Sequence, residues 1–262
     1  MATIRQPAVA GMFYPAEPEE LRRTVLSFLH AAKTRLTAAP KAIVAPHAGY
    51  IYSGPVAGSA YAQLSEHADG ISRVLLLGPS HRVPYRGLAY SSAASFQTPL
   101  GTVPVDQGAF ERVKDLRQVR EYEAPFEGEH CLEVQLPFLQ LVLKDFCIVP
   151  FLVGDASAEE VADVIERLWG GTETLIVISS DLSHYLDYES AKAIDAETSR
   201  AIEALNPSSI SHHQACGRNP LNGLLREAKR HGLHARTLDL RNSGDTAGPR
   251  NQVVGYGAYA FA

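Results

Sequence analysis

Short, continuously apolar segments that alternate with amphipathic stretches constrain the fold of this 262-residue chain more than any other feature. The runs at 41–45, 73–77, 146–153 and 174–178 are rich in Val, Ile and Leu, and each is followed by Pro, Gly or Ser. Such runs are typical of strands that are buried on both faces. Because helical patterns separate them, we expect a single α/β domain over 1–262, with a mostly parallel or mixed central sheet sandwiched by helices.

The stretches between these runs carry helical spacing. Residues 11–33 begin with a turn and then place Leu21, Val25 and Phe28 on one face of an amphipathic helix. We expect Pro137 to kink a helix that includes it. Two strands are expected to finish the chain, at 234–244 and 252–262. The other expected helices cover residues 54–64, 105–116, 129–143, 157–169, 188–205 and 219–231.

Composition excludes several classes of protein. The net charge of −5 and the pI of about 6.1 give no general affinity for nucleic acid. The sequence has no apolar run of membrane-spanning length, and its N-terminal segment lacks the apolar region of a secretory signal, so we expect a cytoplasmic protein with no membrane contact. Three cysteines are too few for a disulfide framework, which leaves metal ligation or nucleophilic chemistry for any cysteine with a special role.

Three of the expected strands end in the same way: a histidine follows each of them within a few residues. His47 follows the first, His81 follows the second, and Asp181 and His184 follow "LIVISS". If these strands are parallel neighbours, their carboxyl ends share one rim, where open α/β sheets bind ligands. Ordinary strand-to-helix turns and helix caps would explain the nearby prolines and Asp181, but they leave the histidines unexplained.

Cys216 adds a fourth element to this set. It precedes a turn and an expected helix and lies near Arg218, an environment that favours a thiolate and suits a metal ligand or a nucleophile. A buried, inert cysteine is the alternative, and we assign that role to Cys131 and Cys147. His212 and His213 are adjacent in sequence, so they are expected on the surface.

The stretch "EGEHCLEVQLPF" has three possible interpretations. On a helix, His130 and Glu133 would share a face, as in metal-binding bundles. Alternatively, Glu129 and Glu133 only favour a helix amino terminus. We prefer the third interpretation, in which His130 supports the metal ligands or contacts the substrate.

Seven ordered segments together resemble the Memo family, in its bacterial and archaeal branch. They cover the chain from about residue 5 to its end: "AVAGMFYPAEPEEL", "APHAGYIYSGPVAGSAY", "LLLGPSHR", "EHCLEVQLPFL", "VISSDLSHY", "ACGRNP" and "NSGDTAG" followed by "VVGY". The resemblance implies a fold similar to that of class III extradiol (LigB-like) non-haem iron dioxygenases. It also implies a metal held by His47, His81 and Cys216.

The resemblance also implies roles for other residues near the metal. His184 corresponds to the acid/base residue of the dioxygenases, and Asp181 and His130 correspond to nearby pocket residues. The related enzymes have a carboxylate where this chain has Cys216, and a thiolate is a softer ligand that would also suit copper or zinc. Relatives in bacteria are often associated with AMMECR1-type and radical SAM proteins, which are therefore possible partners.

Three functions follow as hypotheses. The leading one is an oxidoreductase that uses iron or copper on a small molecule, with His184 transferring protons, Asp181 orienting it, and Tyr50, Tyr52 and Tyr185 flanking the pocket. The second is a redox-metal or peptide-binding module without turnover. The third is a zinc hydrolase with His184 or Glu133 as the base.

Overall fold

The computed structural model describes residues 3–34 and 36–262. Its helices are α1 (Pro18–Ala31), α2 (Tyr50–Tyr61), α3 (Gln107–Glu111), α4 (Leu136–Val142), α5 (Ala158–Arg167), α6 (Tyr188–Glu203) and α7 (Arg218–Arg230). Its strands are β1 (Ile4–Arg5), β2 (Ala42–Ala45), β3 (Arg73–Pro79), β4 (Leu88–Tyr90), β5 (Ser95–Thr98), β6 (Gly101–Pro104), β7 (Val119–Glu121), β8 (Cys147–Val153), β9 (Thr174–Ser179), β10 (His184–Leu186), β11 (Ala235–Asn242) and β12 (Val253–Phe261).

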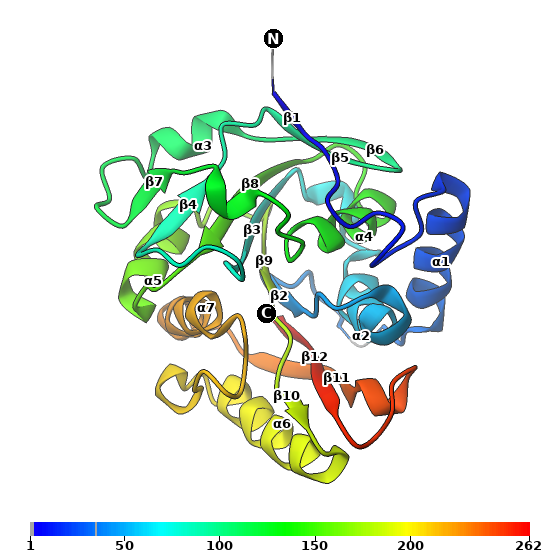
Figure 1. The fold of residues 1–262 in the computed structure, drawn as a ribbon. Helices are drawn as coiled ribbons and strands as arrows, with labels where there is room; N and C mark the ends of the chain where they lie inside the picture. The colour runs from blue at the N-terminus through cyan, green and yellow to red at the C-terminus, as the bar shows by residue number, and fades with distance from the viewer. Residues whose placement is uncertain (1–2, 35) are drawn as a thin grey trace.

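A nine-stranded mixed sheet forms the centre of the molecule (Figure 1). Its order is β10-β12-β2-β9-β3-β8-β4-β7, with β11 paired to β12. The four middle strands, β2, β9, β3 and β8, are parallel, as the apolar runs predict. Almost every residue of these strands is buried, because helices cover both faces.

The helices form two layers around this sheet (Figure 1). α2 packs on β2, β11 and β12, and α1 and α4 pack against α2. On the other face, α7 contacts β3 and β9, α5 packs on α7, and α6 covers β11 and β12. A small separate sheet, β1-β5-β6, joins the N-terminal segment to the rest of the molecule.

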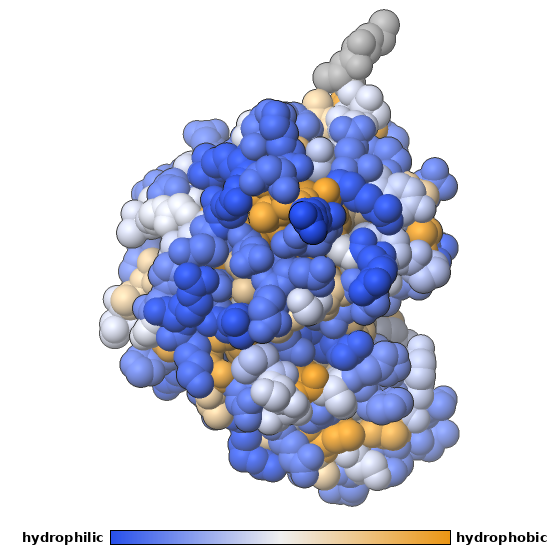
Figure 2. All heavy atoms as spheres, turned by 90° about the vertical axis from the view of Figure 1, so that its left-hand side faces the viewer, coloured by the Kyte–Doolittle hydropathy of each residue, from blue (hydrophilic) through white to orange (hydrophobic). Residues whose placement is uncertain are grey.

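The surface agrees with a chain of moderate charge. Figure 2, which turns the left-hand side of Figure 1 toward the viewer, shows a mostly hydrophilic face with separate apolar patches. Within the described ranges, no helix is both long and apolar enough to cross a lipid bilayer.

Two expected helices differ from the structure. The helix expected at 105–116 is reduced to α3, which ends at Glu111. The helix expected at 129–143 is replaced by a turn, the 3₁₀ segment Glu133–Gln135 and α4. Pro137 therefore lies in the first turn of α4, where its missing N–H costs nothing, and it does not kink a longer helix.

Candidate metal centre

The carboxyl ends of the parallel strands bring the expected histidines together. β2 pairs with β9 in parallel, with Ala45 opposite Ser179, and β3 lies on the other side of β9. His47 and His81 therefore follow the two strands that flank β9, at the same edge of the sheet. Their ring centroids are 5.1 Å apart, and His130 completes the cluster at 5.5 Å from His47 and 5.1 Å from His81.

Each of these three imidazoles offers one ring nitrogen to a common point. The three nitrogens lie within 4.8 Å of one another, which is close enough to bind one metal ion. His47 is 2% exposed, whereas His130 is partly buried and His81 is open to solvent. The structure thus places His130 beside the two expected ligands, although the sequence favoured a supporting role for it.

Cys216 lies on the Nε2 side of the His47 ring, whereas Ser179 of β9 lies on its Nδ1 side. Its Sγ is 3.3 Å from His47 Nε2 and 3.6 Å from the carbonyl oxygen of Asp181. Burial, and next the nearby Asp181 carboxylate, raise the pKa of the Cys216 thiol, so without a metal it is a neutral S–H. The thiolate expected from the neighbouring helix terminus is therefore wrong for the metal-free protein, because desolvation outweighs the helix.

The hydrogen bonds around Ser179 fix the tautomer of His47. Ser179 Oγ has a single proton, and it donates this proton to the carbonyl of Cys131 at 2.6 Å. It must therefore accept from His47 Nδ1 at 2.9 Å, as it does from Gln135 Nε2 at 2.8 Å. His47 Nε2 is left with a free lone pair on the side of Cys216, which is the form a metal ligand needs.

Glu129 plays the corresponding role for His81. Its Oε1 lies 2.9 Å from His81 Nδ1 and 3.4 Å from His130 Nδ1, and its Oε2 accepts the His81 backbone N–H. Burial alone would raise the pKa of Glu129, but the hydrogen bonds and charge of His81 outweigh it and hold that pKa well below its usual value. A carboxylate behind a histidine ligand is a common arrangement in metal sites.

Burial keeps the remaining groups of the cluster neutral. Burial, with His81 and His130 adding to it, lowers the pKa of His47 well below its usual value. The pKa of His130 is also lowered by burial. Neutral imidazoles are the form that binds metal, so His47 and His130 need release no proton, whereas Cys216 must lose its proton to become a ligand.

Asp181 contacts a different partner from the one expected. Its Oδ1 accepts the backbone N–H of His47 at 2.7 Å, so it holds the "PHAGY" loop, and no hydrogen bond joins it to His184 within the described residues. Burial raises its pKa, and the hydrogen bond from His47 offsets part of that shift.

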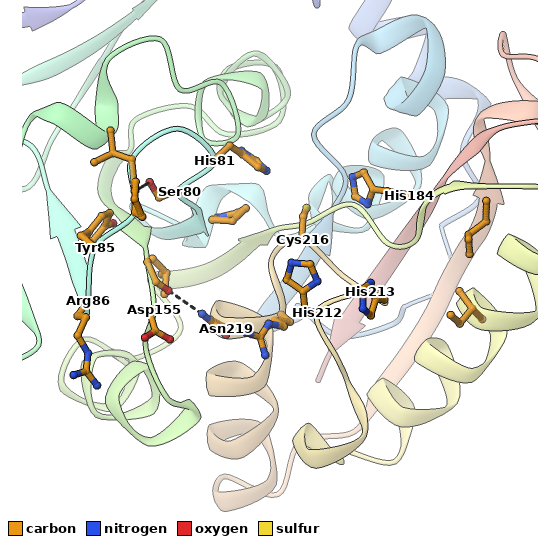
Figure 3. Close-up of a pocket in the computed structure, with 18 residues that line it drawn as sticks. Ser80, His81, Tyr85, Arg86, Asp155, His184, His212, His213, Cys216 and Asn219 are labelled. Atoms are coloured by element: carbon orange, nitrogen blue, oxygen red, sulfur yellow. Dashed lines mark hydrogen bonds between the residues drawn. The ribbon is translucent and has the colours of Figure 1, made fainter.

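A cavity of about 1110 Å³ opens beside the cluster. His81, His184, Cys216 and Arg218 line it, and so do His212 and His213, which were expected to be surface residues without a site role. In Figure 3, His81 and His184 approach from opposite sides, with Cys216 between them in this view. Sequence reasoning missed Tyr85, Arg86 and Asp155, which line the same cavity.

Glu133 and the tyrosines differ most from the expectation. Glu133 is fully buried, and its carboxylate accepts hydrogen bonds from Arg5, Tyr14 and two backbone N–H groups of the N-terminal segment. It anchors that segment and cannot serve as a base in the cavity. Tyr50 is a core residue that donates to the Val134 carbonyl. Tyr52 and Tyr185 are not among the residues that line the cavity, and Tyr185 is 69% exposed.

Sequence comparison identifies the family of this chain. A family model described as Memo-like protein matches residues 5–260. Three similar relatives carry the name MEMO1 family protein. The one from Aquifex aeolicus is 36% identical and covers 97% of both chains. The one from Thermotoga petrophila is 35% identical over 96% of this chain and 97% of its own length. The one from Aeropyrum pernix is 39% identical over 97% of this chain and 98% of its own length. The ordered motifs, the α/β fold and these matches agree, and the chain belongs to the Memo family.

Proposed function

We propose that this protein binds a redox-active divalent metal, iron or copper, and uses it to oxidise a small molecule held in the cavity. The observation that carries the proposal is the convergence of three imidazole nitrogens within 4.8 Å, beside Cys216 and the cavity. The related class III extradiol dioxygenases suggest the same reaction class.

The residues present fit such a metal. His47 and His81 would hold it, because the Nδ1 atom of each already bonds to Ser179 or Glu129 and Nε2 is left for ligation. Cys216 or His130 would supply a third ligand, and the two choices give sites of different softness. A metal bound there supplies redox chemistry with oxygen.

The chain's own residues would position the substrate and move protons. His184 lies on the cavity wall, where its imidazole can exchange a proton with a bound substrate. Arg86 and Arg218 are the two permanent cations on the wall, and Asp155 is its one carboxylate. This balance favours a substrate that carries a carboxylate or another anionic group.

The test begins with metal content after anaerobic purification, by mass spectrometry. We expect near-stoichiometric iron or copper in the wild type, less in C216S and H130Q, and no change in C147S, the matched cysteine control outside the cluster. Absorption of the cobalt-substituted protein separates the two third ligands, since a thiolate gives an intense charge-transfer band that imidazoles do not.

Oxygen uptake with catechol-like and other aromatic acids then tests turnover. Oxygen uptake that is lost when His184 is replaced would support the oxidoreductase hypothesis. Stoichiometric zinc that is reduced in C216S and H130Q, without oxygen uptake, would favour the hydrolase, and iron or copper binding with no substrate turnover would favour a redox-metal module. A folded wild type that takes up no metal would overturn the site itself.

A further inference from the structure

A second group of metal-type ligands lies between α5 and α7, which pack side by side (Figure 1). Glu166 comes from α5, Glu227 from α7, and His231 caps the end of α7. One ligand atom from each lies within 4.8 Å of the other two.

This group is far from the cavity along the sheet. Trp169, which stacks on His231, accepts a hydrogen bond on its carbonyl from Lys41, just before β2. Lys41 marks the amino end of the parallel strands, whereas the histidine cluster lies at their carboxyl ends. The two groups are therefore separated by the length of strands such as β9, roughly 20 Å.

One carboxylate oxygen of the group lacks a hydrogen-bond donor. Glu227 is fully buried, and Arg230 donates to its Oε1 at 3.0 Å. No described residue donates to its Oε2, which faces His231 Nε2 at 3.8 Å. A buried carboxylate oxygen without a partner is costly, so the site needs a proton or a cation at this point.

A protonated His231 cannot meet that need. Its Nε2 carries one hydrogen, and Glu166 Oε2 lies at 2.7 Å, where it takes that hydrogen. Glu227 Oε2 then needs either its own proton, shared with Glu166, or a cation. A metal ion among the three atoms contacts both oxygens and the ring nitrogen at once.

We propose that Glu166, Glu227 and His231 form a second divalent-cation site, suited to zinc. One imidazole and two carboxylates are a ligand set that zinc accepts, and the partial exposure of Glu166 and His231 leaves a position for water. The ion links α5 to α7. Trp169 fixes the His231 ring, because the two rings stack at 3.8 Å with an interplanar angle of 9°.

Trp169 is the chain's single tryptophan, so its fluorescence reports on this site. Cu²⁺, which quenches tryptophan, is the optical probe, and Zn²⁺ competes with it. The variants are E166Q and E227Q, which keep the stack of Trp169 on His231. The matched control is E159Q, which removes a carboxylate of α5 that pairs with Arg226 outside the group.

We expect saturable quenching in the wild type and E159Q, reversed by Zn²⁺, and at least about tenfold weaker binding in E166Q and E227Q. Mass spectrometry should find one fewer zinc per chain in both variants. C216S should keep the quenching, because it changes only the distant cluster. Equal quenching and zinc content in wild type, E166Q and E159Q would overturn the proposal and leave only a proton at this point. Because Glu166 is partly exposed, E166Q decides the matter even if E227Q does not fold.

Discussion

Glu129 and Glu133 are four residues apart, yet their carboxylates have different tasks. Glu129 supports His81 and His130 at the edge of the histidine cluster. Glu133 instead binds the N-terminal segment. Its Oε2 accepts hydrogen bonds from the Arg5 guanidinium at 3.1 Å and from the Ala8 N–H at 2.7 Å. Substitutions at the two positions should therefore separate stability from metal binding.

Glu133→Gln should destabilise the fold and leave the metal site unchanged. The amide keeps one acceptor oxygen and turns an NH₂ group toward the donors, which leaves Arg5 without a counter-charge in a largely buried position. Loss of one partner of such a pair costs about 3 kcal/mol. Urea unfolding measures this loss, with the exposed Glu127→Gln as the control. A stability equal to that of the control would contradict the anchoring role.

Glu129→Gln should weaken metal binding about 10- to 100-fold, because His81 loses the carboxylate that orients its ring. Competition with a chromophoric chelator gives the affinity. Within residues 3–34 and 36–262, the N-terminal segment contacts Glu129 through its backbone carbonyl, which accepts from Arg5, and no hydrogen bond joins the segment to the Glu129 carboxylate. Glu133→Gln therefore serves as the opposite control. An unchanged affinity in Glu129→Gln would remove Glu129 from the site.

The sequence predicted the positions of His47 and His81 because apolar strands with polar ends are a local pattern. It could not assign Glu129, whose partner His81 is 48 residues away in the chain. It also misjudged Glu133, since only the folded chain shows that the N-terminal segment reaches this carboxylate. The roles expected of His184 and Cys216 in catalysis and ligation stay predictions.

The loop before α7 is held close to the end of β9 by a residue without a side chain. A Cβ on Gly217 would lie 2.7 Å from Ser180 Cβ and 2.8 Å from the Ser179 carbonyl oxygen. The Gly217 N–H also donates to Ser180 Oγ at 2.9 Å. This close approach places Cys216 against His47.

Gly217→Ala should therefore displace Cys216 while leaving its thiol present. We expect a loss of about 1–3 kcal/mol in stability from overpacking, together with weaker metal binding. Gly70→Ala is the control, because a Cβ there meets no atom within 4 Å. Metal affinity equal to that of wild type would show that Cys216 placement does not matter.

α6 joins the sheet through Asp195, and this contact depends on pH. Asp195 Oδ1 accepts the Ser183 N–H at 3.0 Å, and burial raises the Asp195 pKa to about 6. A carboxyl with a raised pKa contributes stability below its unfolded pKa, and that stability is lost as pH rises toward 6. The shift of about two units corresponds to about 3 kcal/mol.

Asp195→Asn should remove this dependence. The stability of the variant relative to wild type should increase between about pH 4 and 6 and be constant above that, as measured by urea unfolding across the range. A difference that does not change with pH would show that Asp195 ionises as it does in the unfolded chain.

At the level of elements, the sequence predicted those with strong local patterns. β2, β3, β8 and β9 match their apolar runs, and α5 matches an amphipathic pattern with a Ser157 capping box. The short strands β1, β4, β7 and β10 went unpredicted. They have two or three residues each and are strands only because a neighbour pairs with them.

For the molecule as a whole, a bound metal should act as a stabilising ligand. Free metal at about 100 times its dissociation constant adds about 2.7 kcal/mol to the free energy of unfolding. For a chain of this size we expect a rise of about 5 to 10 °C in Tm, which a chelator reverses. Calorimetry with and without chelator tests this, and an unchanged Tm in a protein that carries metal would show that unfolding does not release the ion.

β12 pairs with three strands: β2 and β10, from distant parts of the chain, and β11, which precedes it. β10 begins with His184, and β2 leads directly to His47, so residues 253–261 hold these two histidines in register. During synthesis on the ribosome, β2, β9 and β3 can pair before the C-terminus is made, but β10 has no partner strand until β12 emerges. The pairing that brings His184 to the candidate site is therefore among the last to form, and a nascent chain stalled before residue 253 should carry all of the candidate site residues without β10 held beside them.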